Sequence, residues 1–209
     1  MRADRPGPGE ELNEGDVADA REAASLILLR DSSEGPEVLL VQRNPEQKFM
    51  GGAWVFPGGA LGEEDSDELD TARRELAEEA SVELTRDAEL VRWSRWITPA
   101  QVKVRFDTHF FVARAPEGTE PEVDGSECVD FRWLRPQDAL DAGTREELLL
   151  VFPTIKHLEQ LAEHGSVEDA LDTARRHKVM PVEPRVVLEG GVAQVLMPGE
   201  EGYEEAGEG

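Results

Sequence analysis

Three glutamates crowded onto one predicted helical face constrain this chain more than any other feature of its sequence. Apolar residues recur at spacings of three and four within residues 66–81, which predicts an amphipathic helix. The same spacings place Glu75, Glu78 and Glu79 on a common face of that helix. Because like charges at this separation repel one another, the cluster destabilises the helix unless a cation neutralises it.

Hard divalent cations such as Mg²⁺ and Mn²⁺ prefer carboxylate oxygens, so a metal site is an economical explanation of the cluster. The alternative is a solvated acidic surface, because 46 of the 209 residues are Asp or Glu. The turn that precedes the helix favours the metal site. Trp54-Val55-Phe56 ends at Pro57-Gly58-Gly59, where we expect proline and paired glycines to break any regular element and to present N–H groups to phosphate oxygens.

The turn and the acidic helix together resemble a known motif. The segments Phe56-Pro57-Gly58-Gly59, Asp65, Arg74-Glu75-Leu76-Ala77-Glu78-Glu79 and Val82 are similar to the box of the Nudix hydrolase family. The resemblance implies an α/β/α sandwich with a mixed β-sheet, to which this chain adds C-terminal helices. It also implies an enzyme that cleaves the diphosphate linkage of a small nucleotide-like molecule with Mg²⁺ or Mn²⁺ as cofactor.

The resemblance implies roles for individual box residues. It makes Glu75, Glu78 and Glu79 the metal ligands, with Glu78 and Glu79 also counted as catalytic. Arg74 would orient a neighbouring carboxylate. The Gly58-Gly59 pair would shape the loop and contact the substrate through its backbone.

The general base stays open at this point. Glu78 or Glu79 would serve directly, whereas in many family members the base comes from a later loop, here Glu120, Glu122 or Glu127. Among these later acids we favour Glu127. The alternative for Glu127 is an exposed acid that merely precedes a strand.

Two departures from the common box bear on the substrate. Asp65 replaces the usual glutamate and is followed by eight rather than seven residues before Arg74, and Ser81 stands where glycine normally precedes Val82. The first departure is similar to the branch of the family that hydrolyses coenzyme A and its thioesters. We therefore predict coenzyme A or an acyl-coenzyme A as substrate.

Such a substrate carries phosphates and an adenine ring, which arginine binds through paired hydrogen bonds and stacking. Arg43, Arg95 and Arg105 are the candidate substrate-binding side chains. For each of them the alternative is an ordinary residue of a half-buried strand.

Three other functions compete with this prediction. ADP-ribose, NADH or another nucleotide is an alternative substrate, because peripheral loops rather than the box set specificity. An isomerase on the same fold needs a reactive cysteine, for which Cys128 is the sole candidate. A non-catalytic Nudix-like binding module would typically have lost acids from the box, so the three retained glutamates favour an enzyme.

The rest of the chain predicts one domain over residues 21–197 between disordered acidic segments, 1–20 and 198–209. The predicted strands are Ala23–Leu29, Val38–Val41, Ala88–Ile97, Val102–Ala113 and Cys128–Leu134. We expect Asp65 or Ser66 to cap the first helix. Thr144-Arg145-Glu146-Glu147 has the form of a capping box and predicts a helix from there to Glu163, interrupted at Pro153.

A further helix is predicted at Ser166–Lys178, followed by a hairpin of Arg185–Leu188 and Val192–Leu196. The apolar segment Leu148–Leu161 is expected to pack on the core. A homodimer interface or a substrate lid are the alternatives for that segment.

The net charge of the chain limits the classes of molecule that it is expected to bind. Its formal net charge is -24, which disfavours polymeric nucleic acid and anionic membranes while leaving a small metal-bound anion as a ligand. With one cysteine the chain forms no internal disulfide, and its N-terminal residues lack the apolar core of a signal peptide. We therefore expect a cytoplasmic protein.

Overall fold

A long central strand, β1 (Arg21–Ser32), organises the fold, and its residues Ala23–Leu29 are all buried. Continuous burial indicates that both faces of the strand are covered, which explains why this segment is an unbroken apolar run rather than an alternating one. The structure is a computed structural model that describes residues 16–189 and 192–206. Neighbours of β1 pair with it on both sides, antiparallel on one and parallel on the other.

Within the described residues, β1 belongs to an eight-stranded mixed sheet. The other strands are β2 (Gly35–Arg43), β3 (Trp54–Val55), β4 (Gly58–Ala60), β5 (Val91–Ile97), β6 (Phe106–Arg114), β7 (Cys128–Leu134) and β8 (Pro181–Val182). Their order is β3-β2-β1-β6-β5-β8, while β4 also pairs with β1 and β7 with β2. The pairs β1–β6 and β5–β8 are parallel and the rest are antiparallel. A separate hairpin follows, formed by β9 (Arg185–Glu189) and β10 (Val192–Leu196).

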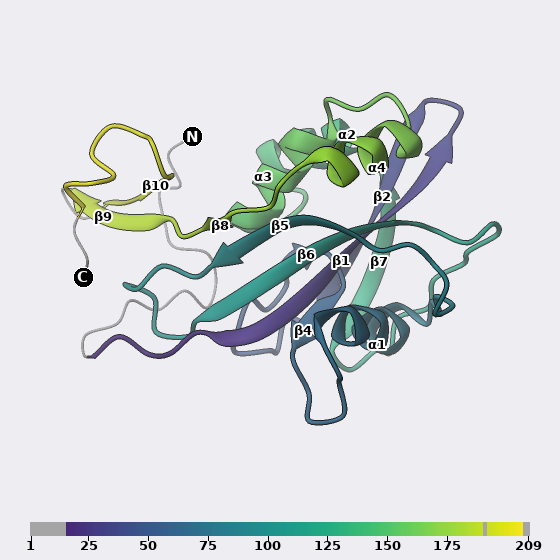
Figure 1. Ribbon diagram of the computed structural model, residues 1–209, viewed down its shortest axis with the longest axis horizontal. Coiled ribbons are helices and arrows are strands. Elements are labelled where there is room, and N and C mark those ends of the chain that lie inside the picture. The colour runs from purple at the N-terminus through teal and green to yellow at the C-terminus, as the bar shows by residue number, and fades with distance from the viewer. Residues whose placement is uncertain (1–15, 190–191, 207–209) are drawn as a thin grey trace.

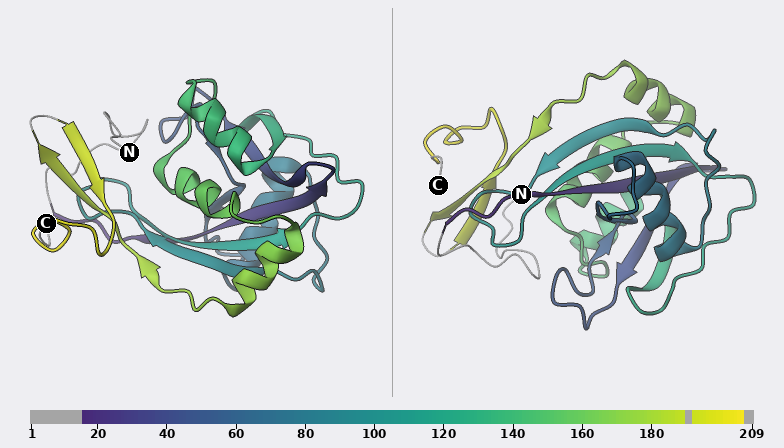
Figure 2. Two further views of the ribbon diagram at one scale, coloured as in Figure 1. Left: turned by 90° about the horizontal axis from the view of Figure 1, so that it is seen from above. Right: turned by 60° about the horizontal axis from the view of Figure 1, so that its bottom comes forward.

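Helices cover both faces of the sheet (Figures 1 and 2). One face carries α1 (Glu68–Ala80), and the other carries α2 (Pro136–Thr144), α3 (Phe152–Leu161) and α4 (Val167–Arg176). The predicted α/β/α sandwich with additional C-terminal helices is thus confirmed. No helix in the described part of the chain is long and apolar enough to cross a membrane.

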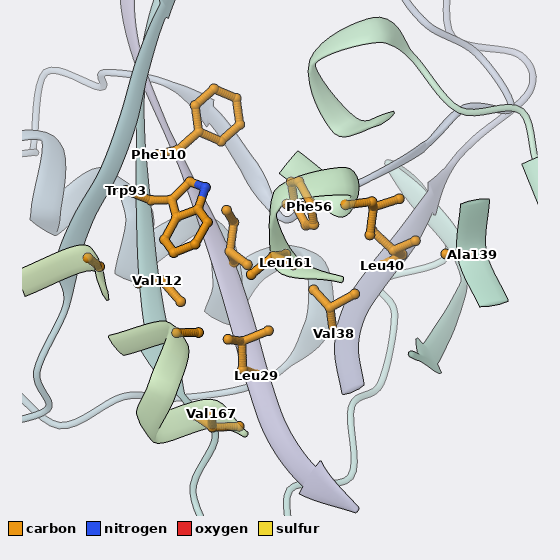
Figure 3. Packing of buried hydrophobic residues seen from close by; sticks show 14 of the residues in the cluster. Leu29, Val38, Leu40, Phe56, Trp93, Phe110, Val112, Ala139, Leu161 and Val167 are labelled. Carbon is orange, nitrogen blue, oxygen red and sulfur yellow. The ribbon is translucent and has the colours of Figure 1, made fainter. Parts of the chain in front are cut away.

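Two hydrophobic cores separate these layers. Alternate residues of β1 point to opposite sides, so Leu26 packs in the cluster that contains Leu76 of α1. Leu29 packs in the other cluster, which contains Leu161 of α3 (Figure 3). All four of these side chains are essentially inaccessible to solvent. The predicted packing of the Leu148–Leu161 segment on the core is confirmed.

A bulge in β5 places two indoles in the same core. Trp93 and Trp96 lie three residues apart and would point to opposite faces of a regular strand, but the register with β6 shifts between Arg92 and Ser94. Both tryptophans therefore lie in the core beneath α3 and α4. This irregularity was not apparent from the simple alternation in the sequence.

Both ends of α1 differ in detail from the expectation. The N-cap is Asp67, whose Oδ1 accepts hydrogen bonds from the N–H groups of Leu69 at 3.0 Å and Asp70 at 2.9 Å, rather than Asp65 or Ser66. At the other end, Ser81 adopts the left-handed conformation with φ of 54°. That conformation explains why glycine is the usual residue at this position of the box.

The predicted capping box at 144–147 is wrong. Thr144 ends α2 rather than beginning a helix, because its Oγ1 donates back to the carbonyl of Leu140 at 3.0 Å, and Glu146 has φ of 60°. The sequence pattern also missed α2 itself, which begins at Pro136. Pro153 does not interrupt a helix, since it lies in the first turn of α3, where its missing N–H costs no hydrogen bond.

Smaller corrections concern strand limits. Gly58 and Gly59 form a short strand, β4, where a break in regular structure was expected. The strands predicted from Ala88 and Val102 begin later, at Val91 and Phe106, because the N–H of Phe106 donates to Thr98 Oγ1 at 3.0 Å and closes a loop before β6.

The predicted C-terminal hairpin is confirmed, although Gly190 and Gly191 of its turn lie outside the described residues. The predicted disorder of residues 1–20 also falls mostly outside them. The division into a 21–197 domain and two disordered segments stays a prediction.

Replacing Ser81 with glycine is expected to stabilise the fold. Ser81 is exposed and left-handed, so Ser81→Gly removes backbone strain without removing packing, and the free energy of unfolding should rise by about 0.5–1 kcal/mol. Urea unfolding followed by tryptophan fluorescence measures this change. Ala77→Gly, inside the same helix, should lower the free energy of unfolding by about 1 kcal/mol. A destabilised Ser81→Gly protein would contradict the prediction.

Candidate active site

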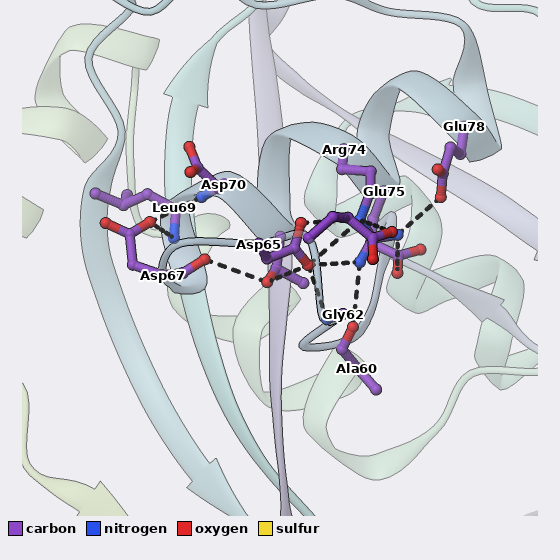
Figure 4. A network of polar contacts seen from close by, with 11 residues as sticks. Ala60, Gly62, Asp65, Asp67, Leu69, Asp70, Arg74, Glu75 and Glu78 are labelled. Carbon is purple, nitrogen blue, oxygen red and sulfur yellow. Dashed lines mark hydrogen bonds and ion pairs between the residues drawn. The ribbon is translucent and has the colours of Figure 1, made fainter.

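Arg74 of α1 joins three carboxylates at one end of the sheet (Figure 4). Its Nε and Nη2 donate to Asp65 at 3.0 and 2.8 Å, and its Nη1 donates to Glu75 Oε1 at 2.9 Å and Glu78 Oε2 at 2.8 Å. Nη2 also reaches the carbonyl of Ala60 in β4 at 3.2 Å. A single guanidinium group therefore ties the helix to the loop and the strand before it.

Asp65 is the most completely bonded of these acids. Its Oδ2 accepts hydrogen bonds from the N–H of Gly62 and from Thr71 Oγ1, both at 2.9 Å, in addition to Arg74. The Arg74 contact lowers the pKa of Asp65 to about 2, so this carboxylate is ionised across the physiological range. Asp65 thus acts as the anchor of Arg74.

Glu79 presents an incompletely bonded carboxylate inside the protein. Its side chain is 2% exposed, and its Oε2 accepts a hydrogen bond from the N–H of Gly58 at 3.0 Å. Its Oε1 is buried with no nitrogen or oxygen donor in hydrogen-bond range. The nearest guanidinium atom, Nη1 of Arg43, lies 3.8 Å away, and the Cys128 thiol contributes a weak hydrogen bond to the carboxylate. Burial, reinforced by the charge of Glu75, raises the pKa of Glu79 to about 7.

Glu75 lies between Glu79 and Arg74. Its residue is 9% exposed, and burial raises its pKa although Arg74 opposes the shift. Negative charges on Glu78 and Glu127 contribute to the same rise. Glu78, by contrast, keeps 58% of its side chain exposed.

Close packing explains why two glycines precede this cluster. In β4, Gly58 pairs with Ser25 and Gly59 with Ala24 of β1, and a Cβ on Gly58 would lie only 2.6 Å from the carbonyl oxygen of Ala24. A Cβ on Gly59 would overlap the carboxylate of Glu75. Glycine at both positions lets the backbone lie between β1 and the glutamates.

A mainly apolar cavity of about 280 Å³ adjoins the same glycines. Its wall includes side chains from β3, β5, β6, the segment after β3, the start of α3 and the C-terminal hairpin, among them Val55, Phe56, Trp96, Phe106, Phe110, Phe152, Val186 and Val195. Among the described side chains, Arg21 and Arg43 are the charged residues that line it, and no acidic side chain does. In a chain of strongly negative charge, the described wall of the pocket beside Gly58 and Gly59 thus carries no carboxylate.

The structure brings some predicted residues together and separates others. Arg43 lines the cavity and faces Glu79, and Glu127 lies on an exposed loop close enough to Glu75 to affect its pKa. Arg95 is instead paired with Asp107, on the sheet face opposite Trp96. Of the arginines predicted to bind substrate, Arg43 thus lies at the site, whereas Arg95 lies outside it.

Arg105, the remaining predicted arginine, also lies outside the site. It donates to the carbonyl of Thr98 at 3.0 Å and pairs with Glu183 at 2.7 Å, where its side chain is 10% exposed. Cys128 is fully buried, and burial raises the pKa of its thiol, which disfavours the isomerase alternative.

Sequence reasoning missed several residues of the cavity. Phe49 and Met50 come from a loop without periodic pattern, yet Phe49 approaches the ring of Phe106 with centroids 5.6 Å apart. Val186 and Val195 were predicted only as hairpin residues. No local signal in the sequence relates these positions to β4, because their proximity depends on the tertiary fold.

The carboxylates of α1 have the chemistry to bind a divalent cation, but their side chains would have to move to converge on one. Among the described residues, no three His, Cys, Asp or Glu side chains converge closely enough to hold a metal ion. However, the orphan Oε1 of Glu79 and the raised pKa of Glu75 and Glu79 are what a buried carboxylate pair shows without its countercharge. The oxygen-only donor set suits Mg²⁺ or Mn²⁺.

Comparison with known proteins identifies the class to which this fold and site belong. The family model described as NUDIX domain matches residues 19–154, well over half of the chain. The chain therefore belongs to the NUDIX family, which confirms the predicted family. The matched segment contains β4, α1 and every box residue discussed above.

Individual relatives agree with this assignment. The chain is 27% identical over 183 residues to putative nudix hydrolase 7 of Caenorhabditis elegans, covering 68% of this chain and 61% of that protein. It thus spans about three fifths of that relative. The crystal structure of a NUDIX hydrolase from Alicyclobacillus acidocaldarius has 28% identity and a TM-score of 0.66, covering 74% of this chain and 96% of the other.

A second solved structure supports the fold alone. The NUDIX domain of Shewanella oneidensis NrtR, crystallised with ADP ribose, has 21% identity and a TM-score of 0.55, over 70% of this chain and 88% of that one.

Metal-free protein should become less stable as the pH rises toward 8. The folded pKa of Glu79, about 7, lies above its ordinary value of 4.5, so its stabilising contribution is complete below pH 4.5 and is lost as the pH passes 7. The loss should reach on the order of 3 kcal/mol. Urea unfolding in a chelator between pH 5 and pH 8 measures it.

The comparison is with two glutamine variants. Glu79→Gln should flatten this pH dependence, while Glu83→Gln, at an exposed position, should retain it. Superimposable pH profiles for wild type and Glu79→Gln would refute the assignment of the shift to Glu79.

Proposed function

We propose that this protein is a divalent-cation-dependent diphosphatase that cleaves the diphosphate linkage of coenzyme A or an acyl-coenzyme A. The observation that carries the proposal is the buried Glu79 carboxylate beside the glycine strand, whose Oε1 has no nitrogen or oxygen hydrogen-bond partner. A carboxylate in that state gains most from a cation, and the cation in turn draws a diphosphate to the adjoining pocket.

The glutamates of α1 would hold Mg²⁺ or Mn²⁺, with Glu75 and Glu79 buried and Glu78 at the exposed end of the cluster. When bound, the cation supplies charge neutralisation for the diphosphate and a lowered pKa for an attacking water. Arg74 keeps Glu75 and Glu78 in place through its hydrogen bonds, so it is a positioning residue. Its anchor, Asp65, fixes the direction of the guanidinium group.

Substrate contacts would come from the other side of β4. Arg43 lines the pocket, and its Nε is buried without a hydrogen-bond partner, which suits donation to a phosphate oxygen. Gly58 and Gly59 line the same pocket, so the proposed diphosphate would lie beside their backbone. In the reaction, water adds to one phosphorus, the bridging P–O bond breaks, and two phosphate monoesters leave.

Glu127 is our preferred general base. It is exposed, lies on the loop before β7, and is close enough to Glu75 to influence it electrostatically. It is not held by Arg74, so its carboxylate is free of the constraint that fixes Glu75 and Glu78. A base at this position would accept the proton that the attacking water loses.

The coenzyme A assignment rests on the sequence departure at Asp65 and on the apolar pocket. Asp65 with its additional loop residue resembles the coenzyme A branch, and the pocket offers a mainly apolar surface to the group beyond the phosphates. ADP-ribose and NADH remain the alternative substrates. ADP-ribose is of particular interest because the Shewanella oneidensis NUDIX domain was crystallised with it.

The test is product analysis by mass spectrometry with Mg²⁺ or Mn²⁺ and a panel of coenzyme A, acetyl-coenzyme A, ADP-ribose, NADH and nucleoside triphosphates. Release of 3′,5′-ADP and phosphopantetheine is expected from coenzyme A. Glu79→Gln should lower kcat at least about 100-fold, as expected for loss of transition-state charge stabilisation, while Glu83→Gln should not.

Other outcomes separate the alternatives. Cleavage of ADP-ribose or NADH in preference to coenzyme A would keep the diphosphatase and reject the substrate assignment. Metal-dependent binding of the panel without turnover would replace the enzyme by a binding module.

A further inference from the structure

The C-terminal hairpin lies outside the matched family domain but forms part of the cavity. The family match ends at residue 154, whereas β9 and β10 follow 30 or more residues later in the chain. Pro184, Val186 and Val195 nevertheless line the same cavity as Gly58 and Gly59. In Figure 1 the hairpin extends from the sheet at the end of β8, at the yellow end of the chain.

The hairpin presents one defined face to the cavity. Val186 of β9 is directly opposite Val195 of β10 in the strand register, so both side chains lie on the same face. Val187 and Gln194, the next opposed pair, point to the other face and do not line the cavity. Among the described side chains of the two strands, those that line the cavity therefore lie on one face of the hairpin.

Polar contacts fix the approach to the hairpin. Arg105, which extends from the segment before β6, pairs with Glu183 at 2.7 Å, and the carbonyl of Glu183 accepts a hydrogen bond from the Tyr203 hydroxyl at 2.8 Å. The N–H of Val186 donates to Gln101 Oε1 at 3.4 Å. Through its ion pair with Glu183, Arg105 thus helps to position the hairpin at the cavity.

The chemistry of the cavity selects its occupant. In a protein with 46 acidic residues, the part of the lining that the structure describes carries two arginines and no acid, and its remaining surface is mainly aliphatic and aromatic. Its volume of about 280 Å³ is at the small end for ligand pockets, which favours a chain over a second nucleoside. Because Gly58 and Gly59 line the same cavity, a group attached to a diphosphate bound at these glycines would enter it.

We infer that Val186 and Val195 form a specificity-determining wall for an acyl or alkyl chain carried by the substrate. The inference rests on the proposed function in that the diphosphate must bind beside Gly58 and Gly59. It goes further because it assigns selectivity to a segment that the family domain does not include.

Calorimetry with butyl, hexyl and octyl phosphate in the presence of Mg²⁺ tests the wall without requiring turnover. Each added methylene should tighten binding to wild type about fourfold while it remains inside the cavity. Val186→Trp and Val195→Trp should fill the cavity and weaken octyl phosphate binding at least about tenfold. Val187→Trp and Gln194→Trp, on the opposite face of the same strands, are the matched controls and should bind like wild type.

Two results would overturn the inference: affinity independent of chain length in wild type, or equal losses in the cavity and control variants. Thermal unfolding of all four variants shows whether the hairpin is intact, and the two wall variants give independent tests. If coenzyme A is not cleaved but the wall variants weaken alkyl phosphate binding, the substrate assignment is rejected and the wall is kept. If coenzyme A is cleaved but the wall variants bind alkyl phosphates like wild type, the wall is rejected and the substrate assignment is kept.

Discussion

The site depends on the bonds between one guanidinium group and three carboxylates. Arg74 binds Asp65, Glu75 and Glu78 at distances of 2.8 to 3.0 Å, and it does so in a chain whose net charge is -24. Without the positive charge of Arg74, the glutamates of α1 would repel one another, and the preceding loop would lose its hydrogen bonds to the helix. Asp65 completes the arrangement because its low pKa keeps the partner of Arg74 ionised.

The glycine strand β4 connects the two sides of the proposed chemistry. Toward α1, the N–H of Gly58 binds Glu79 and the missing Cβ of Gly59 leaves room for Glu75. Toward α3, the same glycines line the apolar cavity whose outer wall includes Val186 and Val195. A diphosphate held at β4 would therefore have the proposed cation-binding carboxylates on one side and a mainly apolar pocket for its organic group on the other.

Local sequence patterns predicted what depends on local physics. The helical spacing of α1, the unbroken apolar run of β1 and the box residues were all recognisable, as was the hairpin of β9 and β10. The capping box at Thr144 failed because its hydroxyl bonds backward to Leu140. The positions of Arg95 and Arg105, and the proximity of Val186 to Gly58, depend on strand order and tertiary packing, which no local pattern encodes.

The most direct test of this account is Mn²⁺ binding measured by calorimetry at pH 6.5 in two buffers of different ionisation enthalpy. Because the pKa of Glu79 is about 7, a bound cation should displace its proton, so wild type should release protons on binding Mn²⁺. Glu79→Gln should bind at least about tenfold more weakly without that release. Equal affinity and equal proton release in both proteins would contradict the assignment of Glu79 as the buried ligand of the cation.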